Sequence, residues 1–297
     1  MTLRRNRRPF TTRVGTVSLL AVGLSPLLLA SPANAADGRA TAAVVGNGGH
    51  HYGLRYSVGA GEQSTVNVTL QEAADHSVFT YTLDDVLEID AGPYCAYPDP
   101  ADLTKVTCEL ENFLGDDRVA NDPEGVLSLD DGNDSVTFTN LTTYDFSSIN
   151  LGSGDNTYTA ARPGAPDAYV SSEAGQDTIT LGTGGFTSSG GGNDDIRLIG
   201  GAATVYASAG ADEVQGGTGN DDLDGGPGDD LIYGNDGNDH ITGAQDNDTL
   251  YGGRGDDVIY GNSGDDVIYG NSGNDVISGG PGTDTIAGGP GNNTITD

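Results

Sequence analysis

The chain has 297 residues, 48 of them glycine, with no tryptophan, 44 acidic residues and a formal net charge of −32. Its large aliphatic residues recur singly at regular positions, which argues against an ordinary globular core and indicates a repeat architecture. Such an acidic chain is repelled by nucleic acid and anionic membranes but attracts cations.

Residues 1–35 read as a signal peptide, so we expect a secreted, extracellular protein. Four arginines in the first eight residues precede an apolar stretch over Val14–Leu29, and Ala33–Ala35 forms an A-x-A cleavage site. The Arg7-Arg8 pair resembles a twin-arginine export motif, and a basic segment for Sec export fits as well. Cleavage after Ala35 would remove five arginines and no acidic residue, which takes the net charge from −32 to −37.

Residues 36–111 are the least repetitive part and are expected to form a short β cap. Val66–Leu70 and Val78–Leu83 alternate apolar and polar residues with the period of a strand. A solenoid needs such a cap because its open end exposes strand edges. Cys95 and Cys108 are the only cysteines, and in an oxidising compartment we expect them to form one disulfide.

Residues 112–215 are expected to form irregular solenoid coils. The core G-x-D-x-U, where U is aliphatic, recurs there at uneven spacing, with one interval of 17 residues between Ile179 and Ile196. Its copies are Gly115–Val119, Gly132–Val136, Gly175–Ile179, Gly192–Ile196 and Gly210–Val214.

Residues 216–296 consist of nine consecutive nonapeptides, the first beginning at Gly216. Position four is glycine in every repeat except that of Asp246, and position eight is always Leu or Ile. Position six is aspartate in eight repeats and Asn293 in the ninth. The eight aspartates, our candidate metal ligands, are Asp221, Asp230, Asp239, Asp248, Asp257, Asp266, Asp275 and Asp284.

The order of residues within a nonapeptide suits a strand followed by a metal-binding turn. A short strand points its middle residue, position eight, into the core because side chains alternate between faces. Glycine allows the turn to adopt positive φ and lets the backbone approach an ion closely. Ca²⁺ takes six to eight oxygen ligands from carboxylates and backbone carbonyls, which the aspartate and the glycine turn together supply.

The repeat G-G-x-G-x-D-x-U-x resembles that of the RTX (hemolysin-type) calcium-binding proteins, and the chain is most similar to the small secreted members found in Gram-positive bacteria. The resemblance implies an all-β fold, a parallel β-roll in which two nonapeptides make one turn. It also implies several Ca²⁺ ions, each held between coils n and n + 2, which gives at most seven positions for nine coils. Asp246 and Asn293 are expected to weaken their local sites.

The sequence predicts calcium-driven folding of a protein that is not an enzyme. One buried aliphatic residue per nonapeptide cannot offset the entropy lost on ordering nine residues, so ion binding would supply the missing folding free energy. Neither H-E-x-x-H nor G-x-S-x-G is present, and Asp-Asp pairs recur with the repeat period. The alternatives are a calcium-dependent extracellular adhesin or matrix component, and a polysaccharide-active enzyme on the irregular coils.

Position nine places Tyr233, Tyr251 and Tyr269 in alternate repeats, so they should stack along one face, with Tyr260 on the other. We call these three residues the tyrosine ladder. Its simpler interpretation is an in-register ladder that helps coils to pair. The other interpretation is a surface for self-association or for an extracellular partner.

Overall fold

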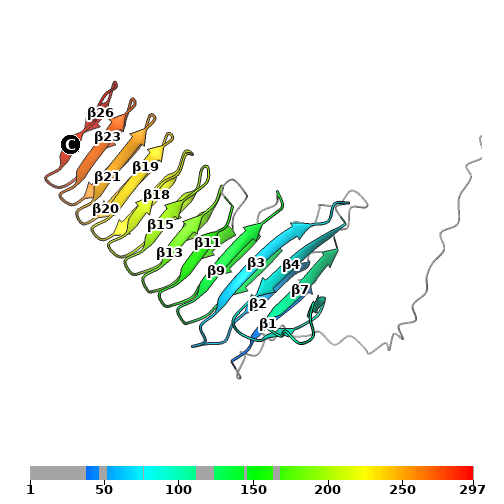
Figure 1. Ribbon diagram of the computed structural model, residues 1–297. Helices are drawn as coiled ribbons and strands as arrows, with labels where there is room; N and C mark the ends of the chain where they lie inside the picture. The colour runs from blue at the N-terminus through cyan, green and yellow to red at the C-terminus, as the bar shows by residue number, and fades with distance from the viewer. Residues whose placement is uncertain are drawn as a thin grey trace, which may run out of the picture. The chain divides into compact units, whose positions relative to one another are not determined.

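The computed structural model describes residues 38–46, 52–75, 77–111, 124–143, 146–162 and 168–296. The predicted signal peptide and the repeat copy at Gly115–Val119 lie outside these ranges. All regular structure in the described residues is β-strand, arranged in two 13-stranded sheets (Figure 1). No helix in this part of the chain could cross a membrane.

The two sheets face each other along the solenoid. Sheet 1 contains β1 (Ala40–Gly46), β2 (Tyr52–Ser57), β5 (Ile89–Ala91), β8 (Glu124–Ser128), β10 (Phe146–Asn150), β12 (Ala168–Ser171), β14 (Phe186–Ser188), β16 (Thr204–Tyr206), β18 (Asp222–Pro227), β20 (His240–Gln245), β22 (Val258–Ser263), β24 (Val276–Ser278) and β26 (Thr294–Thr296). Sheet 2 contains β3 (Thr65–Glu72), β4 (Val78–Asp84), β6 (Cys95–Ala96), β7 (Lys105–Glu111), β9 (Ser135–Asn140), β11 (Thr157–Ala160), β13 (Thr178–Leu181), β15 (Asp195–Leu198), β17 (Glu213–Gln215), β19 (Leu231–Asp236), β21 (Thr249–Arg254), β23 (Val267–Ser272) and β25 (Thr285–Ala287).

From β8 onward, consecutive strands alternate between the sheets, and each pairs in parallel with the next strand of its own sheet. In the regular repeats these partners are 18 residues apart, as in the pairing of Ile232 with Leu250. Two nonapeptides therefore make one turn, and the predicted all-β parallel solenoid is confirmed. Strands β18–β23 have six residues each, more than the short strand expected, because pairs such as Asn235 with Gly253 extend the ladder into the next repeat.

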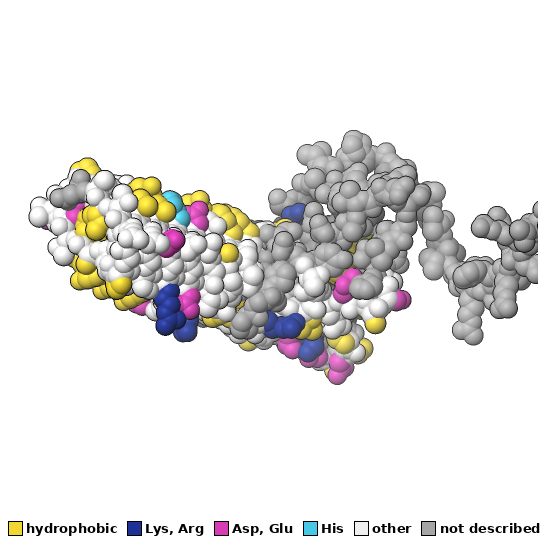
Figure 2. Space-filling model, turned by 90° about the horizontal axis from the view of Figure 1, so that it is seen from above, with side chains coloured by type: hydrophobic (Ala, Val, Ile, Leu, Met, Phe, Trp, Pro, Cys, Tyr) yellow, Lys and Arg dark blue, Asp and Glu magenta, His cyan; other side chains and the backbone are white. Residues whose placement is uncertain are grey.

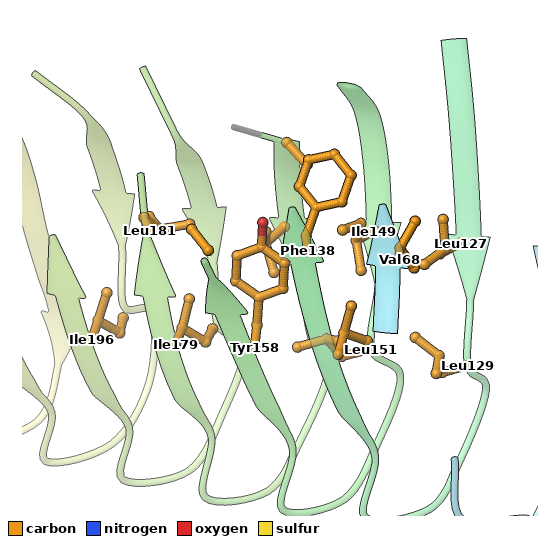
Figure 3. Close-up of a cluster of buried hydrophobic side chains, with 14 of the residues drawn as sticks. Val68, Leu127, Leu129, Phe138, Ile149, Leu151, Tyr158, Ile179, Leu181 and Ile196 are labelled. Carbon is orange, nitrogen blue, oxygen red and sulfur yellow. The ribbon is translucent and has the colours of Figure 1, made fainter. Parts of the chain in front are cut away.

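The core lies between the two sheets. In the regular repeats, every position-eight residue from Leu223 to Ile277 is fully buried. The upstream coils contain larger side chains, including Tyr158 and Phe138, which pack against aliphatic residues from both sheets (Figure 3). The upstream coils thus bury more apolar surface per turn, and more hydrophobic stabilisation follows from it.

The N-terminal strands close one end of the solenoid. Strand β2 pairs in parallel with β8, and β3 with β9, so both already belong to the parallel stack. Beyond them the pairing becomes antiparallel, between β1 and β2 and along β3, β4, β7 and β6. The predicted disulfide between Cys95 and Cys108 is present and joins β6 to β7.

The tyrosine ladder forms as predicted on sheet 2. Adjacent ring centroids are 4.9 and 5.0 Å apart, and the rings are within 7° of parallel. Tyr260 lies on sheet 1, also as predicted. The three rings are half-buried because each covers its neighbour, which agrees with a ladder that helps coils to pair.

Candidate metal centre

The position-six aspartates form a ladder along each edge of the roll. Edge 1 is the set of turns that lead into sheet 1, and edge 2 the set that leads into sheet 2. Along both edges, the backbone N–H of one aspartate donates to Oδ1 of the aspartate 18 residues later, at 2.9 Å from Asp221 to Asp239 and from Asp230 to Asp248. The aspartates from Asp221 to Asp275 are at most 2 % exposed. Few acidic side chains are therefore seen on the regular coils in Figure 2.

The second carboxylate oxygen of these aspartates, except that of Asp221, has no hydrogen-bond partner. Oδ2 is buried and unpartnered in seven of the eight predicted ligands, and in Asp221 it accepts from Gly217 N–H at 2.9 Å. A buried charged oxygen without a partner is strongly unfavourable, so each such site requires either a proton or a cation. The seven residues are Asp230, Asp239, Asp248, Asp257, Asp266, Asp275 and Asp284.

Burial makes four of these carboxylates, on both edges, weaker acids when no ion is bound. It raises the pKa of Asp230 and Asp239 from 3.8 to about 7, and that of Asp248 to about 8. The pKa of Asp257 rises to about 6 for the same reason. Neighbouring carboxylates on the same edge raise these pKa values further, because a charged aspartate disfavours a second negative charge nearby. A cation would remove both penalties.

Glycine at position one lets two oxygen atoms converge. A Cβ on Gly234 would lie 2.4 Å from Oδ2 of Asp239 and 2.4 Å from the carbonyl oxygen of Gly252, two coils further on. A Cβ on Gly252 would meet the equivalent oxygens of Asp257 and Gly270 at 2.4 and 2.7 Å. We call this oxygen-lined space the cradle, and any side chain at position one would fill it.

The two irregular repeats keep the hydrogen-bond ladder. At Gly255, where φ is 130°, position four has no room for a side chain, because a Cβ there would lie 1.7 Å from the carbonyl oxygen of Gly237. Asp246 takes this position with φ of 73°, a left-handed conformation that aspartate tolerates better than most residues. Asn293 accepts from Asp275 N–H at 2.8 Å through Oδ1, but its other terminal atom is an amide nitrogen that donates to the Gly289 carbonyl. The last repeat thus keeps the hydrogen-bond ladder without a second carboxylate oxygen.

A second ladder, at position five, was not predicted from the sequence. Its exposed Asn and Asp side chains accept hydrogen bonds in the opposite direction, from the backbone N–H two coils later. Asn247 N–H donates to Asp229 at 2.9 Å, and Asp265 N–H donates to Asn247 at 2.9 Å. The sequence signal for this ladder was the frequent Asn-Asp or Asp-Asp pair at positions five and six, because the side chain at position five can nearly always accept a hydrogen bond.

The aspartate ladder on edge 2 also extends far upstream. Asp134, Asp177, Asp194 and Asp212 are buried there with Oδ2 unpartnered. Asn156 completes the series, accepting from Asp134 N–H and donating its own N–H to Asp177, at 2.9 and 2.8 Å. On edge 1, the ladder has no aspartate at position 203 in the described residues, where Ala203 N–H donates to Asp221 at 2.9 Å.

Side chains alone do not form a metal site in the described residues. No group of three or more His, Cys, Asp and Glu side chains converges in this part of the chain. A cation at the cradle would instead take one carboxylate oxygen per repeat together with backbone carbonyl oxygens. This donor set contains only oxygen and suits a hard cation such as Ca²⁺ rather than zinc or copper.

A family model described as the RTX calcium-binding nonapeptide repeat matches the chain in four copies, over residues 199–232, 224–259, 233–268 and 260–295. No curated protein matches the chain. The C-terminal third of the chain therefore consists of RTX calcium-binding repeats of the hemolysin type, folded as a β-roll.

Proposed function

Because the C-terminal coils are RTX calcium-binding repeats, we propose that the protein binds several Ca²⁺ ions between stacked turns and that this binding drives folding of residues 216–296. The ligands would be the eight position-six aspartates and the carbonyl oxygens of position-one glycines. The main support is the row of buried Oδ2 atoms that have no partner. Ca²⁺ would supply a positively charged partner for each of these oxygens.

Coupling between binding and folding follows from the energetics of the regular coils. Near neutral pH without an ion, each buried aspartate must hold a proton against its ordinary pKa or remain charged in a dry site. Both alternatives destabilise the folded state, and the single aliphatic residue per repeat offers little to offset them. Calcium binds only the folded arrangement, so its binding free energy becomes folding free energy.

We further propose that the protein acts outside the cell as a non-enzymatic calcium-binding protein. RTX repeat proteins are typically secreted, and the predicted signal peptide agrees with export. The disulfide fits an oxidising compartment. Extracellular calcium modules bind at about 10⁻⁴–10⁻³ M, so a chain of this kind would be empty inside a cell and loaded outside. Turnover of an acidic polysaccharide would instead favour the enzymatic alternative.

The test is a calcium titration of calcium-depleted protein, followed by far-UV circular dichroism, with magnesium as the control ion. We expect a cooperative gain of β signal with calcium at high-micromolar to millimolar concentration, and little gain with magnesium. Replacing Asp239 and Asp257 with Asn should weaken the response at least tenfold. A matched control is the double variant Asp256→Asn and Asp229→Asn, which also removes two negative charges, from exposed side chains of the position-five ladder, and keeps an acceptor oxygen at each. A spectrum that calcium leaves unchanged would refute the proposal.

A further inference from the structure

The residue at position one differs between the regular repeats and the upstream coils of edge 2. Where the nine repeats have glycine, the five upstream turns have Leu129, Leu151, Ser172, Ser189 and Ala207. These residues occupy the same place in the fold. Ala207 N–H donates to the carbonyl of Asp224 at 2.9 Å, which corresponds to the bond from Gly216 N–H to the Tyr233 carbonyl at 2.7 Å.

The upstream side chains stand at the position where glycine leaves room for the cradle in the regular repeats. Leu129, Leu151, Ser189 and Ala207 are fully buried, and Ser172 is 8 % exposed. In the regular repeats, a Cβ on Gly234 would approach the carboxylate oxygen and the next carbonyl to within the length of a calcium–oxygen bond, and on edge 2 a Cβ on Gly261 would approach the equivalent oxygens to 2.3 and 2.8 Å. A real side chain there removes the room that an ion needs to contact both.

The two serines also satisfy the oxygen that would otherwise face the cradle. Ser172 Oγ donates to the carbonyl of Ser189 at 2.8 Å, and Ser189 Oγ donates to the carbonyl of Ala207 at 2.7 Å. These acceptors are position-one carbonyls, the same oxygens that Gly252 and Gly270 present in the regular coils. A hydroxyl group therefore performs, within the chain, part of the task that an ion would perform downstream.

We infer that the calcium-binding part of the ladder begins at Gly216 and that the upstream aspartates of edge 2 bind no ion, because side chains at position one close their cradles. The upstream aspartates keep the turns in register through Oδ1 alone. The chain then has two parts, a base over residues 38–215 that folds without calcium and nine coils that calcium adds to it. The inference rests on the proposed function and defines where its sites lie.

The base has its own means of stability. It contains the disulfide, the antiparallel strands of the cap and the large buried side chains between its sheets. Strands β16 and β17 at its end pair with β18 and β19. The base thus presents a preformed edge on which the first calcium-dependent coil can assemble.

Two measurements on the full-length protein test the inference. The first is the number of bound calcium ions, determined by equilibrium dialysis against calcium chloride. The double variant D177N/D194N should bind as many ions as the unmodified protein, whereas the matched pair D248N/D266N, on the same edge of the regular coils, should bind at least two fewer. Asn is compatible with both places, since Asn156 and Asn293 already sit in the ladder. A loss of ions from D177N/D194N would overturn the inference.

The second measurement is limited proteolysis of calcium-depleted protein, with fragments identified by mass. We expect a resistant fragment that ends near residue 215 and rapid cleavage beyond it, with resistance extended to the C-terminus when calcium is added. Digestion of the base, or equal resistance of both parts without calcium, would overturn the inference. If no ion bound to the unmodified protein, the proposed function would fail, and the proteolysis pattern would still show whether the base folds separately.

Discussion

Acid should replace calcium in folding the regular coils. Burial raises the pKa of Asp230 and Asp239 from 3.8 to about 7 in the ion-free fold, so the folded state holds protons that the unfolded chain releases near pH 4. Stability from such groups is complete below the unfolded pKa and is lost as pH rises through the folded pKa. The ion-free coils should therefore be most stable in acid and should unfold as pH rises through about 6–8.

The size of the effect follows from the raised values. Each pH unit between the ordinary and the raised pKa is worth about 1.4 kcal/mol. An aspartate with a folded pKa of about 7 thus loses about 4 kcal/mol of stabilisation between pH 4 and pH 8. Asp248, on the same edge as Asp230, has a folded pKa of about 8, so the two together lose about 10 kcal/mol. This loss is comparable with the whole free energy of unfolding of a typical domain, about 5–15 kcal/mol.

The assay is far-UV circular dichroism of calcium-depleted protein between pH 8 and pH 5. This range stays above the isoelectric point of about 4.1, where the protein would aggregate. We expect β signal to rise as pH falls, with a midpoint between about 6 and 7, and calcium at pH 8 to produce the same spectrum. In the variant D230N/D239N/D248N the pH dependence should be weaker because the amides do not titrate. A spectrum that is constant across this range, or β signal that falls in acid, would refute the reasoning.

Three further changes probe individual features. Gly252→Ala places a Cβ 2.4 Å from Oδ2 of Asp257, so calorimetry should show weaker calcium binding, by tenfold or more, and an unchanged affinity would contradict the cradle. Asp246→Gly removes an aspartate from a left-handed turn. It should increase the free energy of unfolding of the calcium-loaded protein by roughly 1 kcal/mol and so raise its melting temperature. A lower melting temperature would show that the side chain has another role. Replacing the tyrosine ladder with serine should lower the melting temperature and leave the sedimentation coefficient unchanged at the value of a monomer. If the unmodified protein sedimented as an oligomer and the variant as a monomer, the result would support a surface for self-association.

Periodicity made the regular repeats predictable. Position eight faces the core and position six the turn at every ninth residue, so the positions of the strands and of the aspartates follow from one pattern. That two nonapeptides make one turn was implied by the resemblance to the RTX repeat. The disulfide was predictable because the chain offers a single pair, Cys95 and Cys108. The tyrosine ladder follows from the same period, since residues 18 apart lie side by side.

The upstream coils were predictable only in outline because their period varies. Successive ladder residues from Asp134 to Asp212 are separated by 22, 21, 17 and 18 residues. The ladder on edge 2 stays in register, so the extra or missing residues lie elsewhere in each turn. Asn156 was missed because it replaces the aspartate that marks a repeat. The serines at position one gave no signal in the sequence, since their role depends on a carbonyl oxygen one turn away.

The ladder separates what shapes the roll from what stabilises it. Hydrogen bonds from backbone N–H groups to Oδ1 fix the distance between turns, both at the aspartates and at Asn156. The series ends at Ser64, whose N–H donates to Asp134 at 2.7 Å. Oδ2 takes no part in this spacing and is the atom left without a partner. An ion at Oδ2 would therefore change the stability of the turns far more than their geometry. Calcium would then act as a condition for folding of these turns, and the aspartate and glycine positions would set their geometry.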